Sequence, residues 1–166
     1  MLMEQNATPG LPNRLLSRLV RTAAVTYEES LATFGSKAFV AGNPVRPEFF
    51  STAASERAAD GPTRVLVFGG SQGAHAINVA MAEGAAALAA ASPRVEVTHQ
   101  TGERDLSMVR EAYAAAGLVS RVEPFLYEMD REMRAADVIV CRSGATTLAE
   151  LTAAGRTAVL IPLPTA

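Results

Sequence analysis

Short apolar runs alternate with longer stretches of helical periodicity along most of this chain. The clearest example is the run at residues 64–68, which is rich in β-branched residues and leads through a glycine-rich turn into an alanine-rich segment. A run of this kind indicates a buried strand, and the alanine-rich segment predicts a helix from Gln72 to about Ala91. Repetition of this order predicts an α/β fold with parallel strands and right-handed crossovers.

The pattern of apolar and polar positions predicts the other elements of the chain. Met1–Pro12 is expected to be a loop, and Asn13 to be the N-cap of a helix that runs to about Val20. Further strands are expected at Ala23–Tyr27, Lys37–Ala41, Val95–His99, from Val122, at Asp137–Cys141 and at Ala158–Ile161. Further helices are expected at Glu28–Phe34, Asp105–Ala116, Met129–Ala135 and up to Ala154, with Ser92-Pro93, Gly117 and Gly155 as stop signals.

The composition between these elements predicts two units. Pro44 and Pro47 keep the chain around Arg46 extended, and Ser51–Pro62 has the small, polar composition of a linker. We therefore expect one unit over residues 1–46, a linker over 47–62 and a second unit over 63–166. No helix follows the last expected strand to cover the sheet, so we expect the chain to be part of a longer protein, truncated at both ends.

Overall composition excludes several classes of protein. The chain has 166 residues, of which 49% are hydrophobic, and a formal charge of −2, which argues against a nucleic-acid partner. The single Cys141 ends an apolar run and is read as a core residue rather than a nucleophile. No stretch approaches the roughly 20 apolar residues that a membrane-spanning helix needs. We therefore expect a soluble, cytoplasmic protein.

A basic stripe lies on the expected helix after Asn13. Leucines at four-residue spacing form one face, and Arg14, Arg18 and Arg21 lie on another. A basic stripe can meet an anionic lipid surface. The alternative, a solvated helix face, is the commoner arrangement.

The glycine-rich turn Gly69-Gly70-Ser71-Gln72-Gly73-Ala74 is the first candidate for chemistry. Glycines let the backbone approach a phosphate, and the free N–H groups of the helix that follows point at it. The turn is neither a Walker A loop nor a dinucleotide fingerprint, because it lacks both the Gly-Lys-Ser/Thr ending and the G-x-G-x-x-G spacing. The alternative is a tight turn that binds nothing.

A second turn between strand and helix, at Cys141–Thr147, is expected at the same sheet edge, where ligands of open α/β folds bind. Glu150 lies one turn further on and could accept hydrogen bonds from vicinal sugar hydroxyls; the alternative is a capping-box partner. His75 and His99 look isolated from any Cys or Asp pattern, and Asp-x-Asp is absent, so we expect no metal. A bound diphosphate would then depend on backbone N–H groups, the helix dipole and arginine.

Four blocks of residues together carry a resemblance to a known family. They are Glu4-Gln5-Asn6, Gly42-Asn43-Pro44-Val45-Arg46, the turn at 69–74, and Cys141-Arg142-Ser143-Gly144-Ala145 with Glu150. In this order and spacing the chain resembles the MurG glycosyltransferases, which add N-acetylglucosamine to the lipid-linked muramyl-pentapeptide precursor of peptidoglycan. The resemblance implies a Rossmann-like GT-B fold of two domains and needs no cofactor or metal. It places residues 1–46 at the end of the N-terminal acceptor domain and 63–166 in the donor-binding domain.

The resemblance also implies roles for individual residues. The implied contacts to UDP-N-acetylglucosamine are Asn6, Arg46, Ser71, Leu126 through its backbone, Ala145, Thr146, Thr147, Leu148, Ala149 and Glu150, the last on the ribose. Support for the phosphate turn is implied for Gly69, Gly70, Gln72, Gly73, Ser143 and Gly144. Met3 stands where the family usually has His, and it receives no role. No catalytic residue is assigned, because the family's general base lies in a glycine-rich loop that these 166 residues do not contain.

The implied activity is inverting transfer from UDP-N-acetylglucosamine to a lipid-linked acceptor, on the cytoplasmic face of the plasma membrane. Isolated, the chain would be an inactive or weakly binding part of the enzyme. Two alternatives stay open. One is a related GT-B transferase with another sugar or acceptor, and the other is a non-catalytic, nucleotide-binding Rossmann-like module.

Overall fold

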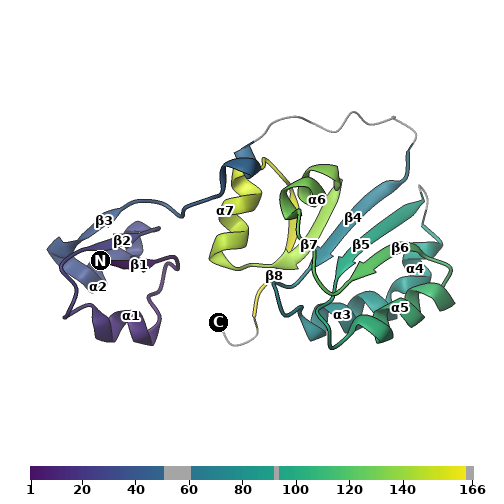
Figure 1. Cartoon of the computed structure of the whole chain (residues 1–166), viewed down its shortest axis with the longest axis horizontal. Coiled ribbons are helices and arrows are strands. Elements are labelled where there is room, and N and C mark those ends of the chain that lie inside the picture. The colour runs from purple at the N-terminus through teal and green to yellow at the C-terminus, as the bar shows by residue number, and fades with distance from the viewer. Residues whose placement is uncertain (51–60, 92–93, 164–166) are drawn as a thin grey trace. The chain divides into compact units, whose positions relative to one another are not determined.

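The computed structural model describes residues 1–50, 61–91 and 94–163. These residues form two units: residues 1–46 together with 144–150, and the rest of the described chain from residue 47 onward. Each unit contains one parallel sheet, shown in purple to blue for the first and in teal to yellow for the second (Figure 1). The expected α/β class with parallel strands is therefore confirmed.

The first unit is small. Its three-stranded sheet has the order β1-β2-β3, and a cluster of Leu2, Ala23, Val25 and Phe34 forms its core. The elements are β1 (Leu2–Glu4), α1 (Leu11–Leu16), β2 (Ala23–Val25), a 3₁₀ turn (Glu28–Ser30), α2 (Leu31–Phe34), a second 3₁₀ turn (Gly35–Lys37) and β3 (Ala38–Val40).

Two expectations for this unit are wrong. Residues 2–4 form a strand rather than a loop, because they pair in parallel with β2 and bury Leu2 and Glu4. The first helix begins at Leu11 with Gly10 as its N-cap, and it ends at Leu16 instead of near Val20. Asn13 does not cap it; its amide donates instead to the carbonyl oxygen of Met3. Neither a three-residue strand nor a hydrogen bond from Asn13 to a distant backbone carbonyl gives a periodic pattern in the sequence.

The second unit is built on a five-stranded parallel sheet of order β6-β5-β4-β7-β8. Its elements are a 3₁₀ turn (Pro47–Phe50), β4 (Thr63–Phe68), α3 (His75–Glu83), α4 (Ala85–Ala89), β5 (Val95–Gln100), α5 (Leu106–Ala115), β6 (Val119–Glu123), α6 (Met129–Ala135), β7 (Val138–Arg142) and β8 (Ala158–Ile161). Helix α7 (Ala145–Ala153) precedes β8, and its residues 145–150 are grouped with the first unit. In the 3₁₀ turn Phe49 is fully buried, and the carbonyl of Glu48 accepts a hydrogen bond from Arg134. The rest of the expected linker, residues 51–60, lies outside the described residues.

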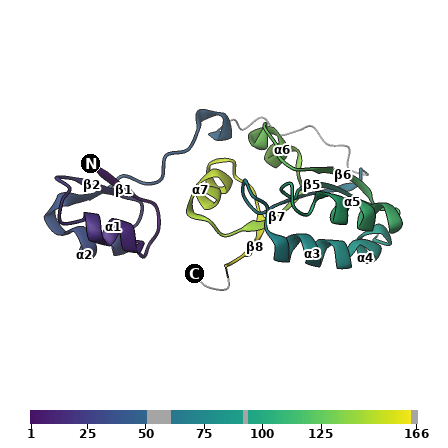
Figure 2. The same cartoon turned by 60° about the horizontal axis from the view of Figure 1, so that its bottom comes forward.

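Helices cover both faces of this sheet. Val65 and Val67 of β4 pack into one core cluster with residues of α3, α4 and α5, while α6 lies on the opposite face (Figure 2). Alternation along β4 puts Leu66 on the α6 face, where Met133 is also fully buried. Burial on both faces explains why β4 reads as a continuous apolar run rather than an alternating one.

The expected strands and helices of this unit are confirmed, with two shifts. The helix expected from Gln72 to Ala91 starts at His75 and is interrupted at Gly84, which separates α3 from α4. The strand expected from Val122 begins earlier, at Val119, because its main chain pairs in parallel with β5. The expected stop at Ser92-Pro93 lies outside the described residues. Among the described residues, none of the helices is long and apolar enough to cross a membrane.

Candidate functional site

The strand order places a topological switch at β4. From β4 the chain runs to β5 and β6 on one side, and then returns to the other side of β4 for β7 and β8. Phe68, the last residue of β4, pairs with Gln100 of β5 and with Cys141 of β7, so the turns that follow these strands leave from the same edge. In open α/β sheets, ligands bind at the carboxyl edge beside such a switch.

The glycine turn between β4 and α3 occupies this edge. Gly70 and Gly73 have positive φ angles of 93° and 73°, and the N–H of Gly73 donates to the carbonyl of Gly70 at 2.9 Å. Ala74 precedes α3 without making a side-chain cap, and Ser71 is exposed. Uncapped N–H groups, a helix dipole and a hydroxyl at one exposed turn provide donors for an anion.

The glycine turn is locked against the turn after β5. A Cβ placed on Gly73 would lie 1.8 Å from the carbonyl oxygen of Thr101, and one placed on Gly102 would lie 2.2 Å from that of Gln72. The two backbones therefore touch where only glycine leaves room. Hydrogen bonds to the end of β6 hold the turn after β5: Thr101 N–H donates to Glu123 O, and Gly102 N–H donates to Pro124 O.

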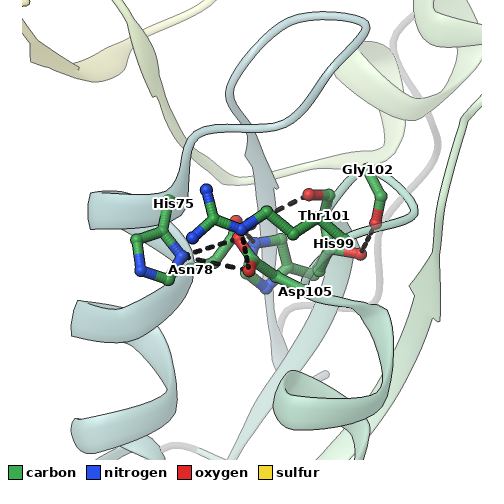
Figure 3. A network of polar contacts seen from close by, with 7 residues as sticks. His75, Asn78, His99, Thr101, Gly102 and Asp105 are labelled. Carbon is green, nitrogen blue, oxygen red and sulfur yellow. Dashed lines mark hydrogen bonds and ion pairs between the residues drawn. The ribbon is translucent and has the colours of Figure 1, made fainter.

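A buried network centred on Asn78 holds the turn after β5 (Figure 3). Its amide nitrogen donates to Thr101 O at 2.9 Å and to Asp105 Oδ2 at 2.8 Å, and its amide oxygen lies 3.0 Å from His99 Nε2. Because this oxygen only accepts, His99 Nε2 carries the proton, and His99 Nδ1 accepts from Tyr113 Oη at 2.8 Å. Burial lowers the pKa of His99 to about 4, so the ring is neutral.

The other histidine is also paired. His75 Nδ1 lies 3.0 Å from both carboxylate oxygens of Asp105. Burial alone would raise the pKa of Asp105, but hydrogen bonds from Asn78 and His75 and the nearby charges of His75 and Arg104 lower it. The expectation that His75 is isolated from Asp is therefore wrong, whereas the partners of His99, Asn78 and Tyr113, are neither Cys nor Asp. His75 and Asp105 are thirty positions apart and form no sequence motif, although Gly102, just after the β5 strand, could have drawn attention to this turn.

Gln100 links the glycine turn to the segment after β6. Its Nε2 donates to Gly70 O at 2.8 Å, and its Oε1 accepts from the N–H of Leu126 at 3.0 Å. The side chains of Gln100 and Leu126 are both buried. At Leu126, the residue expected to contact a ligand through its backbone, the N–H group already has a partner. Sequence reasoning did not single out Gln100.

Glu150 lies on α7 and pairs with Arg46. Helix α7 begins at Ala145, so Glu150 is its sixth residue, too far along for a capping box, which needs the third. That alternative is therefore wrong. Glu150 Oε1 lies 3.6 Å from Arg46 Nη2, and the Glu150 side chain is 16% exposed. Burial raises the pKa of Glu150, although the charge of Arg46 opposes the shift.

Asn6 is held by the buried carboxylate of Glu4. Glu4 Oε1 accepts from the backbone N–H of Asn6 at 2.9 Å and from its side-chain Nδ2 at 3.1 Å, while Glu4 Oε2 accepts from Asn13 Nδ2 at 2.8 Å and Gly10 N–H at 3.3 Å. Burial would raise the pKa of Glu4, but these hydrogen bonds lower it. The first unit thus fixes Asn6 through the carboxylate of Glu4, two residues earlier.

The other expected site residues lie on the two turns and on α7. Gly69, Gly70, Gln72 and Gly73 form the turn after β4, Ser143 and Gly144 follow β7, and Ala145, Thr146, Thr147, Leu148 and Ala149 lie in the first half of α7. Cys141 is fully buried, and burial raises its pKa to about 11, which suits a core residue. Within the described ranges, no group of three or more His, Cys, Asp or Glu side chains could hold a metal ion.

Comparison with known proteins identifies relatives for nearly all of this chain. The family model "Glycosyltransferase family 28 C-terminal domain" matches residues 64–166. The chain is 42% identical to a protein of Anaeromyxobacter sp. (strain K) and 44% identical to one of Geotalea uraniireducens, over 99% and 97% of its length. Both are named UDP-N-acetylglucosamine--N-acetylmuramyl-(pentapeptide) pyrophosphoryl-undecaprenol N-acetylglucosamine transferase. The matches cover 43% and 45% of those proteins, so the chain spans less than half of their length.

The structures of known proteins agree with this result. The crystal structure of Acinetobacter baumannii MurG matches 99% of this chain and 46% of that protein, with a TM-score of 0.72 and 34% identity. A glycotransferase of kitacinnamycin matches with a TM-score of 0.54 at 18% identity, which shows a shared fold alone.

Proposed function

Because the chain belongs to glycosyltransferase family 28, we propose that it carries the donor site of a transferase acting on UDP-N-acetylglucosamine. The proposed acceptor is the lipid-linked muramyl-pentapeptide that the names of its relatives describe. One observation carries the proposal: the glycine turn lies at the carboxyl edge of β4, beside the topological switch, and leads into the uncapped start of α3. This arrangement suits a diphosphate.

The chain's own groups would act on the departing diphosphate. When the bond between the sugar and the β-phosphate breaks, negative charge develops on the diphosphate. Backbone N–H groups of the glycine turn and the N-terminal end of the nine-residue helix α3 would stabilise that charge without rearranging, because the contact with the Thr101-Gly102 turn fixes them. A base that these 166 residues do not supply would remove the proton of the acceptor hydroxyl.

The other roles follow from the sequence resemblance and remain predictions. Leu126 would meet the uracil through its carbonyl, since its N–H is donated to Gln100. Glu150 would accept hydrogen bonds from the ribose hydroxyls, with Asn6 and Arg46 as further donor contacts. In this proposal residues 1–46 end the acceptor domain, 47–62 link the domains and 63–166 bind the donor. The lipid acceptor would place the whole enzyme at the cytoplasmic face of the plasma membrane.

Calorimetric titration of the chain with UDP tests the proposal. We expect binding with similar affinity in magnesium and in excess chelator, because the donors at this edge are N–H groups and hydroxyls, which attract the anion directly rather than through a cation. Absence of UDP binding would overturn the proposed donor site. Binding that requires magnesium would mean that the diphosphate is held by a metal and not by the glycine turn.

Glu150→Ala is expected to weaken UDP binding by about 1.5–3 kcal/mol, because it removes an ionised acceptor of ribose hydroxyls. Loss of the ion pair with Arg46, whose side chain is 61% exposed, should by itself change the free energy of unfolding by at most about 1 kcal/mol. Parallel titrations and chemical denaturation of the same protein separate the two effects.

Two further variants serve as controls for Glu150. Glu150→Gln keeps the shape but removes the charge, so its affinity for UDP should fall between those of the wild type and the alanine variant. Glu83→Ala removes an exposed carboxylate at the far end of α3 and should leave the affinity unchanged. Wild-type affinity in both Glu150 variants would rule out the ribose role.

A further inference from the structure

Gln100 makes two hydrogen bonds whose directions are unambiguous. Gly70 O can only accept and Leu126 N–H can only donate, so the amide nitrogen of Gln100 must face Gly70 and its oxygen must face Leu126. Gln100 is only 2% exposed, and its backbone belongs to β5, which pairs on both sides. A single rigidly held side chain therefore connects two separate segments of the candidate site.

The bond to Gly70 fixes the orientation of one peptide plane. Gly70 O accepts from both Gln100 Nε2 and Gly73 N–H, so the carbonyl points toward the protein. In a trans peptide the carbonyl and the following N–H point in opposite directions, which turns the N–H of exposed Ser71 to the other side. No close neighbour of Gly70 holds this plane, because a Cβ there would meet nothing within 4 Å.

The bond to Leu126 decides which backbone group remains for a ligand. With its N–H donated to Gln100 at 3.0 Å, Leu126 can offer only its carbonyl oxygen. A carbonyl accepts from the N3–H of uracil and has no donor for the N3 acceptor of cytosine. Gln100 thus influences both the anion-binding turn and the group expected to meet the base.

We propose that Gln100 is a positioning residue for the nucleotide: it holds the Gly70–Ser71 peptide with its N–H toward the diphosphate and leaves only the Leu126 carbonyl for the base. This inference rests on the proposed UDP site. Gln100 itself touches neither ligand group in this scheme. Its effect is on how the two segments present their backbones.

Two substitutions separate the two hydrogen bonds. Gln100→Met removes both hydrogen bonds while keeping a side chain of similar size. It should weaken binding of UDP about tenfold or more and also weaken binding of uridine. Gln100→Glu keeps a carboxylate oxygen that can accept from Leu126 N–H. When the carboxylate is ionised, however, its other oxygen cannot donate to Gly70 O, so the bond to the glycine turn is lost. This variant should weaken UDP about tenfold and leave uridine within about twofold. Thr98→Val, two residues earlier on the same strand, is the matched control and should bind both as the wild type does.

The pH dependence of the Gln100→Glu variant gives a readout that loss of stability would not produce. A protonated carboxyl can again donate to Gly70 O while accepting from Leu126 N–H, so it restores both bonds. Gln100 is buried, and burial raises the pKa of a carboxyl at this position. Relative to the wild type at each pH, UDP affinity of Gln100→Glu should therefore recover as the pH falls from 8 to 6, whereas that of Gln100→Met should stay reduced. Thermal melts at each pH establish that each variant is folded.

The outcomes distinguish this inference from its premise. If the wild type does not bind UDP, both the donor site and the role of Gln100 are overturned. If the wild type binds UDP and the folded Gln100→Met variant binds it equally well, the donor site stands and the positioning role fails. Parallel losses for UDP and uridine in Gln100→Glu, without recovery at lower pH, would also contradict the positioning role.

Discussion

Replacing Gly73 by alanine is expected to lower the free energy of unfolding by about 2–5 kcal/mol. A left-handed conformation costs a non-glycine residue about 1–2 kcal/mol, and an overpacked contact adds about 1–3 kcal/mol. The added Cβ would lie 1.8 Å from Thr101 O and 2.5 Å from Thr101 C, which are backbone atoms. They cannot move aside easily, because Asn78 and β6 hold the Thr101-Gly102 turn.

Gly117→Ala is the matched control for this substitution. Gly117 has a φ angle of 68°, close to the 73° of Gly73, but a Cβ there would meet nothing within 4 Å. It should therefore cost only the conformational strain of about 1–2 kcal/mol. Urea denaturation of the two variants measures the difference. Equal losses would show that contact between the two turns does not constrain Gly73.

The second large effect is an expected loss of stability at acidic pH. Burial lowers the pKa of His99 to about 4, whereas an unfolded histidine titrates near 6.5. Below pH 6.5 the unfolded chain therefore binds a proton that the folded chain does not, so stability falls as the pH drops from 6.5 to about 4. The free energy of unfolding should decrease by about 3 kcal/mol across this window. Denaturation midpoints measured at half-unit pH steps provide the test.

Two comparisons isolate His99. His99→Gln removes the titrating ring, so the loss of stability between pH 6.5 and 4 should largely disappear, while His75→Gln should retain it because His99 stays buried. Asp105 acts in the same direction at lower pH. Its pKa is lowered, so its contribution is present above its unfolded value of about 3.9 and is lost below it. An unchanged slope in His99→Gln would contradict the assignment.

Most of the second unit could be predicted because its elements are long and locally consistent. The apolar run ending at Phe68 and the glycine turn after it give strand, turn and helix directly from pattern. The three-residue strand Leu2–Glu4 could not be predicted, since only its pairing with Ala23–Val25 defines it. Gly84 interrupts a stretch whose pattern otherwise predicts one helix. The sequence does not show whether a single glycine is tolerated inside a helix or ends it.

Some residues of the candidate site could likewise be predicted from local sequence patterns, and others could not. Residues on the two turns, such as Ser71 and Ser143, were predicted because strand-to-helix turns leave a local signature. Gln100, Asn78 and Asp105 were not, because their roles depend on partners 21 to 30 residues away that only the fold brings together. A buried amide in a strand looks like any other polar residue until both of its partners are known.

The position of β4 in the middle of its sheet has a consequence for the order in which the chain folds. Thr63 of β4 pairs with Val95 of β5, whereas Val65 of β4 pairs with Val138 of β7. The second pair is separated by more than twice as many residues along the chain as the first. Closing the longer loop costs about 0.7 kcal/mol more. The buried residues of the cluster beneath β4–β6 all come from the segment Val65–Val122. Pulse-labelled amide exchange during refolding should therefore find β5 protected before β7. During synthesis, the half of the sheet that carries the glycine turn can assemble while β7 and β8 are still being made.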